Sequence, residues 1–149
     1  MSKIRKAWDK YTEGWFGVLV YLFLGFVIAY GVNIILGITL RTETPVVAVF
    51  SNSMVPTFYR GDMIIVYGEE NLKVGDVVVF DSPDKKYPII HRVHEVKDGG
   101  IITKGDNVAS TDEGRWGVIS FDKIHGKAFL KIPILGWVKI LFVEFTGLG

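Results

Sequence analysis

Residues 75–104 read GDVVVFDSPDKKYPIIHRVHEVKDGGIITK. Runs of β-branched and apolar residues occupy positions 77–80, 89–96 and 101–104. Turn formers separate these runs: Ser82-Pro83-Asp84 follows the first, and Asp98-Gly99-Gly100 precedes the third. Short apolar runs bounded by Gly, Pro and Asp are typical of β-strands joined by tight turns. The stretch therefore predicts antiparallel strand pairing.

The same pattern continues on both sides of this stretch. Similar runs lie at residues 45–50, 63–67 and 123–130. Residues 42–131 contain no amphipathic helical repeat of useful length. We therefore expect residues 41–131 to form a small, mostly β domain, built as an antiparallel barrel or sandwich.

The segment before this domain is strongly apolar. Residues 15–40 contain no charged side chain, and Asn33 is their only strongly polar one. As a helix these residues would extend about 39 Å, which exceeds the roughly 30 Å of a bilayer core. The segment is too long for the apolar region of a cleavable signal peptide. It predicts a retained transmembrane helix.

The distribution of basic residues predicts the orientation of this helix. Lys3, Arg5, Lys6 and Lys10 precede it, whereas only Arg41 closely follows it. The positive-inside rule then places residues 1–14 in the cytoplasm. We expect a single-pass protein of the cell membrane with the β domain outside, or in a lumen.

The C-terminal segment 132–149 is apolar again. Its residues 132–145 read IPILGWVKILFVEF, with Lys139 and Glu144 as the interruptions. Three interpretations are open: an element packed on the β domain, an interfacial helix, or a short second span. We favour contact with membrane lipid, because the anchor already holds the domain at the bilayer.

Composition excludes several classes of function. The chain has 149 residues, enough for one small domain. Its formal net charge of +1 gives no support to nucleic-acid binding. It has no cysteine, which rules out disulfides, thiolate nucleophiles and cysteine-ligated metals. We expect neither a metal nor an organic cofactor.

Two residues could supply a nucleophile and a base. Ser53 follows a predicted strand in a polar turn, although serines in turns also cap backbone groups. Strand alternation places His91 on the buried face and His94 on the opposite one, so the two cannot bind one metal. His125 lies far along the sequence from these residues, and we expect it to have no carboxylate partner close by.

Carboxylates complete a possible hydrolytic site. Asp62 and Asp76 each open a strand after a glycine and are interpreted as turn residues, whereas Asp106 and Asp112 share a polar loop. A serine needs a base, and a histidine base needs a carboxylate to fix its tautomer. The spacing does not decide which of the two loop carboxylates plays that part.

Five short motifs occur in a fixed order. They are Ser51-Asn52-Ser53-Met54-Val55-Pro56-Thr57, Arg60-Gly61-Asp62, Gly75-Asp76-Val77-Val78-Val79-Phe80, His91-Arg92-Val93 and Lys104-Gly105-Asp106-Asn107. In this order they resemble the boxes of type I signal peptidases, over roughly residues 45–130. Bacterial members carry a lysine base where this chain has His91. The chain therefore resembles the archaeal and endoplasmic-reticulum branch.

The resemblance implies a role for each candidate residue. It implies Ser53 as nucleophile, His91 as general base and Asp112 as the assisting acid. Asp106 is implied to support the site. The Ser51 hydroxyl and the Ser53 backbone N–H are implied to form the oxyanion hole.

Two positions in the motifs bear on the implied mechanism. Asn52 stands where the family usually has glycine, and asparagine tolerates positive φ better than most residues. Lys104 is the only lysine within the five motifs, so a Ser-Lys mechanism is an alternative to test.

The resemblance also implies the reaction and the partners. It implies a membrane-bound serine endopeptidase that removes signal peptides from preproteins, with the secretion channel or accessory subunits as further partners. Two alternatives remain. One is another membrane-tethered serine protease or a self-cleaving regulator, and the other is a non-enzymatic, anchored β module that binds peptides.

Overall fold

The computed structural model describes residues 14–147. The chain divides into two compact units, residues 1–39 and 40–149. The predicted cytoplasmic segment lies outside the described residues, apart from Gly14.

The first unit contains the apolar helix α2, Gly14–Leu40. Its 27 residues correspond to about 40 Å of helix. Gly17 is its only buried residue. Among residues 14–147, α2 is the one helix long and apolar enough to cross a bilayer.

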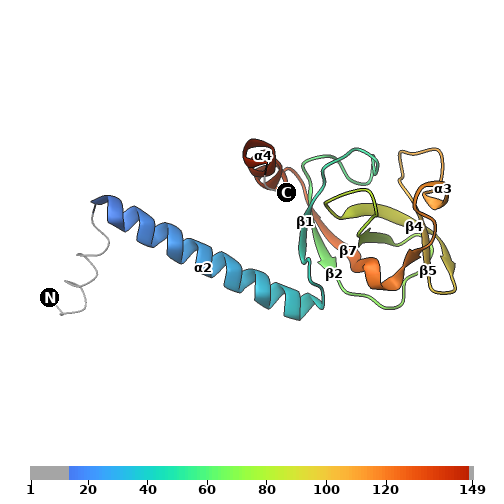
Figure 1. The fold of residues 1–149 in the computed structure, drawn as a ribbon, viewed down its shortest axis with the longest axis horizontal. Helices are drawn as coiled ribbons and strands as arrows, with labels where there is room; N and C mark the ends of the chain where they lie inside the picture. Colours follow the sequence, from blue (N-terminus) through green and yellow to red (C-terminus); the bar gives the residue numbers. More distant parts are fainter. Residues whose placement is uncertain (1–13, 148–149) are drawn as a thin grey trace. The chain divides into compact units, whose positions relative to one another are not determined.

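The second unit is built on one antiparallel sheet, as predicted from the short apolar runs (Figure 1). Its described strands are β1 (Val46–Ala48), β2 (Met63–Tyr67), β3 (Val77–Phe80), β4 (Ile89–Lys97), β5 (Gly100–Lys104), β6 (Ile119–Ser120) and β7 (Ile124–Ile132). Their order across the sheet is β1-β2-β7-β3-β4-β5-β6. Strand β1 is therefore an edge strand, and β3 lies near the middle.

The core lies on both sides of β3. All four residues of β3 are buried, which is why this strand reads as a continuous apolar run and not as an alternating one. Val77 and Val79 join one apolar cluster with Ile64 of β2, while Val78 and Phe80 join a second. Because β3 is packed on both faces, it provides a rigid base for its neighbour β4.

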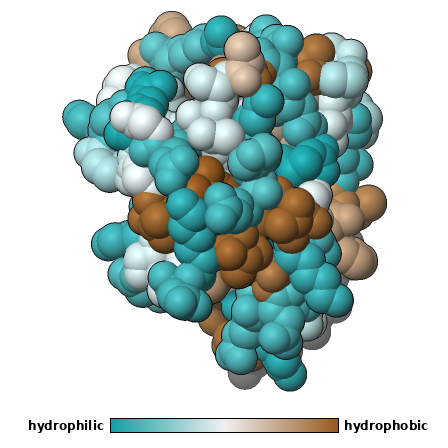
Figure 2. All heavy atoms as spheres, turned by 90° about the vertical axis from the view of Figure 1, so that its right-hand side faces the viewer, coloured by the Kyte–Doolittle hydropathy of each residue, from teal (hydrophilic) through white to brown (hydrophobic). Residues whose placement is uncertain are grey.

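Three short helical segments complete the described part of this unit. They are α3 (Glu113–Trp116), the 3₁₀ turn η1 (Phe121–Lys123) and α4 (Trp137–Thr146). The end of the unit at which α3, β4 and β5 lie has a mostly hydrophilic surface, with apolar side chains gathered across its middle (Figure 2).

Helix α4 follows β7 in the C-terminal apolar segment. It packs through Ile140, which is fully buried. Its ten residues extend about 15 Å, half the thickness of a bilayer core, so α4 cannot form a second span. Five of its apolar side chains remain exposed, Trp137, Val138, Leu141, Phe142 and Phe145.

Candidate active site

Ser53 lies in the loop that joins β1 to β2. The residue next to it, Met54, is 1% exposed and belongs to the core. The carbonyl of Met54 accepts the N–H of Phe58, another core residue, at 2.9 Å. The loop is thus anchored at the position that follows Ser53, while Ser53 itself is only partly buried.

His91 lies in β4, opposite Val78 of β3. It is 6% exposed, whereas His94 is exposed, so the predicted separation of the two histidines is confirmed. The Nε2 atom of His91 lies 3.0 Å from the Ser53 hydroxyl oxygen. A residue on a rigid strand is thereby held within hydrogen-bond distance of a residue on the anchored loop.

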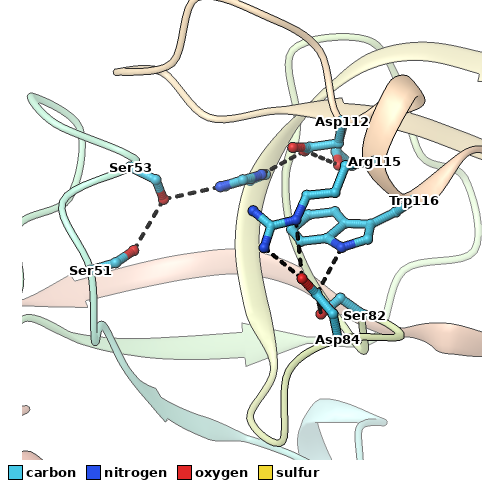
Figure 3. Close-up of polar contacts among 9 residues, drawn as sticks. Ser51, Ser53, Ser82, Asp84, Asp112, Arg115 and Trp116 are labelled. Atoms are coloured by element: carbon cyan, nitrogen blue, oxygen red, sulfur yellow. Dashed lines mark hydrogen bonds and ion pairs between the residues drawn. The ribbon is translucent and has the colours of Figure 1, made fainter.

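Asp112 immediately precedes α3 and is buried. Its Oδ2 atom lies 2.6 Å from Nδ1 of His91 and accepts the hydroxyl of Thr103, also at 2.6 Å. The Asp112 N–H donates to the carbonyl of Thr103, which ties the loop to β5. Figure 3 shows Ser51, Ser53 and Asp112 along this row of contacts.

The contacts of His91 determine which of its two ring nitrogens carries a proton. A carboxylate only accepts hydrogen bonds, so Asp112 selects the His91 tautomer that carries its proton on Nδ1. The Nε2 atom is then the acceptor for the Ser53 hydroxyl proton. The three side chains form the geometry in which a serine hydroxyl becomes a nucleophile.

Two further donors lie close to Ser53. The Ser51 hydroxyl oxygen is 3.2 Å from that of Ser53. Within residues 14–147, the Ser53 N–H donates to no protein acceptor. The Ser51 hydroxyl therefore lies beside the serine oxygen, and the Ser53 N–H is left without an acceptor in the described part of the protein.

Asp106 makes a different set of contacts from Asp112. It accepts two hydrogen bonds from Arg92, at 2.8 and 2.6 Å, and one from the Thr57 hydroxyl. The hydrogen bonds from Arg92 hold the pKa of the Asp106 carboxyl below its ordinary value, and the Thr57 hydroxyl adds to this effect. Asp106 thus links β4 to the Ser53 loop, and it is Asp112 that contacts His91.

Asn52 does not adopt the positive φ that its place in the motif suggested. In the described part of the chain, the non-glycine residues at positive φ are Arg41 and Ile134. The Asn52 side-chain oxygen instead accepts a hydrogen bond from the Arg60 backbone N–H at 3.1 Å. The Asn52 backbone carbonyl accepts one from the side-chain amide of Asn107 at 3.3 Å. Asn52 therefore braces the loop through hydrogen bonds.

Gly105 is required by a close approach of backbone and side chain. A Cβ atom added there would lie 2.8 Å from the Ser53 carbonyl oxygen and 3.1 Å from Nε2 of His91. The Asn107 N–H donates to that same Ser53 carbonyl at 2.8 Å. The absence of a side chain at position 105 lets the two loops meet at the serine and the histidine.

A cleft of about 250 Å³ opens onto these residues. Ser53, His91 and Asp112 line it, together with Phe50 beside β1 and Tyr87 from the β3–β4 loop. The Phe50 and Tyr87 rings stack with centroids 5.3 Å apart. Lys104 lines a separate cavity, with Arg92 and His94.

Contacts between distant residues were not visible in the sequence. His125, for which no carboxylate was expected, has its Nε2 atom 2.9 Å from Oδ1 of Asp81, so that expectation is wrong. Asp84 contacts Arg115 and Trp116 beside the site, and no motif pointed to these residues. Asp62 and Asp76 accept backbone N–H groups from Tyr59 and Lys73, as turn residues do.

The arrangement of titratable side chains does not favour a metal centre. Within residues 14–147, no group of three His, Asp or Glu side chains is placed to hold a metal ion. The chemistry available at the cleft is that of the serine, the imidazole and the carboxylate.

Comparison with known proteins places the chain among peptidases. The model of the family described as Peptidase S24-like matches residues 30–115, which include Ser53, His91 and Asp112. The chain is 40% identical over 119 residues to the signal peptidase complex catalytic subunit of Dictyostelium discoideum, covering 72% of this chain and 65% of the relative. It is 39% identical over 120 residues to that of Eremothecium gossypii, covering 73% and 72%. It is 35% identical over 119 residues to the corresponding subunit of Scheffersomyces stipitis, which covers 73% of this chain and 72% of that relative.

Proposed function

Because the chain belongs to the Peptidase S24-like family, in the group of signal peptidase catalytic subunits, we propose that it is a membrane-bound serine endopeptidase that removes signal peptides from secreted preproteins. The observation that carries this proposal is the continuous contact from Ser53 through His91 to Asp112, at 3.0 and 2.6 Å. This contact supports an enzymatic function, because a peptide-binding module without enzymatic activity would not need a serine, a histidine and an aspartate in contact.

The proposed reaction is a two-step acyl transfer. The Ser53 oxygen attacks the peptide carbonyl while Nε2 of His91 takes the hydroxyl proton. Asp112 accepts a hydrogen bond from Nδ1–H of His91 and stabilises the imidazolium that forms. His91 then gives the proton to the leaving amine, which leaves an acyl-enzyme. His91 next takes a proton from a water molecule that attacks the acyl carbonyl. It returns this proton to the Ser53 oxygen as the acyl C–O bond breaks, which releases the new carboxyl group and restores Ser53.

The oxyanion of each tetrahedral intermediate needs donors that are in place before the reaction. The Ser53 N–H and the Ser51 hydroxyl are the proposed pair, because the hydroxyl lies beside the attacking oxygen and the N–H has no acceptor in the described part of the protein. We assign Asp106 a supporting role: through Arg92 and Thr57 it holds the Ser53 loop against β4.

The substrate segment is proposed to bind as an added strand along the free edge of β1. Backbone hydrogen bonds would supply affinity, and alternate side chains would enter the cleft. A second cavity of about 220 Å³ lies along β1; Phe50 and Tyr87 line it too, together with Val143 of α4. Small side chains at the −1 and −3 positions are the substrate features that the family implies.

We further propose how the protein sits in a membrane. Helix α2 is the single span, with the N-terminus cytoplasmic and the catalytic unit outside or in a lumen. The exposed apolar side chains of α4 would contact lipid at the membrane surface. Accessory subunits and the secretion channel are the proposed protein partners, because the relatives are subunits of a complex.

The proposal is tested by cleavage of a radiolabelled preprotein with the detergent-solubilised full chain. Wild type is compared with Ser53→Ala, His91→Ala, His91→Lys and Lys104→Ala. We expect one cut by the wild type, none by the two alanine variants at Ser53 and His91, and cleavage within about threefold of wild type for Lys104→Ala. A Ser53→Ala protein that still cuts would overturn the assignment. Loss of cleavage in Lys104→Ala with activity retained in His91→Ala would favour a Ser-Lys mechanism.

A further inference from the structure

A second polar cluster lies against the candidate site. Asp84 in the β3–β4 loop accepts the indole N–H of Trp116 at 2.8 Å and the hydroxyl of Ser82 at 3.2 Å (Figure 3). Its other carboxylate oxygen accepts Arg115, with Nη2 at 2.5 Å and Nε at 3.1 Å. Arg115 and Trp116 belong to α3, the short helix that follows Asp112. One carboxylate therefore joins the β3–β4 loop to the segment that carries the acid.

The Trp116 indole is a neighbour of the His91 ring. The two ring centroids are 5.9 Å apart, with the planes tilted by 33°. Phe80 meets Trp116 edge-on at 5.8 Å and His91 edge-on at 6.3 Å. The imidazole is thus enclosed by two aromatic rings as well as held at each of its nitrogens.

Hydrogen bonds at the two nitrogens leave one motion open to the imidazole. The ring can tilt about the line that joins Asp112 to Ser53, and tilting changes the direction of the Nε2 lone pair. A neighbouring ring that cannot move restricts this tilt. The Trp116 ring is itself fixed at its polar edge by Asp84 and covered by the Arg115 guanidinium, 4.9 Å from the ring centroid.

We propose that Asp84 is a positioning residue for the reaction: by accepting the indole N–H it fixes Trp116, and Trp116 fixes the orientation of His91 toward Ser53. This inference rests on the proposed function for its kinetic consequence, although not for its structural one. The ion pair with Arg115 is half-exposed and contributes little energy by itself. The indole bond is the contact that carries the effect.

The structural consequence is tested without any substrate. The full chain is labelled with ¹⁵N-histidine in detergent, and the His91 ring signals are assigned by their loss in His91→Ala. Because the Trp116 ring current acts on His91, we expect Asp84→Ala to move these signals. Asp84→Asn keeps an acceptor for the indole N–H, so in this variant the His91 signals should stay at their wild-type positions. Asp98→Ala, the same change at an exposed aspartate in the β4–β5 turn, should leave them in place.

A double-mutant cycle separates this role from simple support of the loop. Trp116→Phe keeps an aromatic ring but removes the N–H donor. If Asp84 acts through the indole, Asp84→Ala shifts the His91 signals in the wild-type background and adds nothing in the Trp116→Phe background. Equal shifts in both backgrounds, or none in either, would overturn the proposal.

The kinetic arm uses the same variants with a preprotein substrate. A base displaced from its nucleophile costs about ten- to a hundredfold in rate. We expect Asp84→Ala to lower kcat about tenfold with KM within twofold, and Asp84→Asn to recover most of it. An unchanged kcat in Asp84→Ala overturns the positioning role. A wild type that cuts no preprotein overturns the proposed function instead, while the histidine signals still decide the structural role of Asp84.

Discussion

Arg92 holds Asp106 through two contacts, Nε to Oδ1 at 2.8 Å and Nη2 to Oδ2 at 2.6 Å. Arg92 follows His91 in β4, so its side chain leaves the opposite face of the strand. Asp106 also accepts the Thr57 hydroxyl of the Ser53 loop, whereas the carboxylate that contacts the His91 imidazole is that of Asp112. Two carboxylates of one loop therefore serve two different elements of the site.

Asp106 makes folding stability depend on pH in a predictable direction. The hydrogen bonds from Arg92 lower its pKa in the folded state, so its stabilising contribution is complete above the unfolded value of about 4. That contribution is lost as the pH falls through the lower, folded pKa. We expect Asp106→Asn to reduce the free energy of unfolding by about 1–3 kcal/mol at pH 7. The difference from wild type should shrink below about pH 4, in thermal melts of the full chain in detergent. A gap that widens on acidification would contradict this account.

The two loop carboxylates should differ in their kinetic effects. Asp112→Asn replaces a pure acceptor with a group that no longer enforces the Nδ1–H tautomer of His91. We expect kcat to fall by about a thousand- to ten-thousandfold with little change in KM. Asp106→Asn is the matched control, and its kcat should fall much less because it does not contact His91. Equal losses in the two variants, measured on one preprotein, would show that the roles are not divided in this way.

Gly105 should not tolerate even one added methyl group. In Gly105→Ala the new carbon would crowd the Ser53 carbonyl and the His91 ring, so the two loops must separate. We expect cleavage to fall by at least about a hundredfold. Gly114→Ala in α3 is the control, because a Cβ there meets nothing within 4 Å. That variant should keep its activity and gain up to about 1 kcal/mol of stability. Full activity in Gly105→Ala would argue against the tight contact.

The exposed apolar side chains of α4 should lie in lipid. The chain has no native cysteine, so one cysteine can be introduced at Phe145, which is 93% exposed, and spin-labelled. In proteoliposomes we expect oxygen to relax this label more than a water-soluble nickel complex does. A label at Asp98 in the β4–β5 turn, the control, should show the reverse preference. Matching behaviour at both positions would place α4 in water.

Local patterns in the sequence predicted the strands better than their arrangement. The boundaries of β2 and β3 agree with the predicted runs 63–67 and 77–80. The run 45–50 shortens to Val46–Ala48. At Val49 the regular pairing with β2 ends, because its N–H donates to the carbonyl of Asp62 while its own carbonyl accepts the N–H of Gly61. The place of β7 between β2 and β3 depends on pairing between distant segments, which no local pattern contains.

In the candidate site, too, the residues within motifs could be predicted from the sequence, and the contacts between distant loops could not. Ser53, His91 and Asp112 were proposed from motifs and from the resemblance, and their placement in one row agrees with that proposal. The contact between Asp84 and Trp116 joins residues 32 positions apart, and neither lies in a motif. Contacts of this kind follow from how loops meet over a folded sheet.

If the substrate binds along β1 as proposed, the shortness of this edge strand limits how strongly a peptide is held. Three residues offer few backbone partners, so an added strand gains little from the ladder alone. A long open edge would also recruit other copies of the chain and start aggregation. So short an edge offers little for pairing between copies of the chain, and under the proposed binding mode it favours release of the cut product. Turnover, and not tight capture, is what this edge favours.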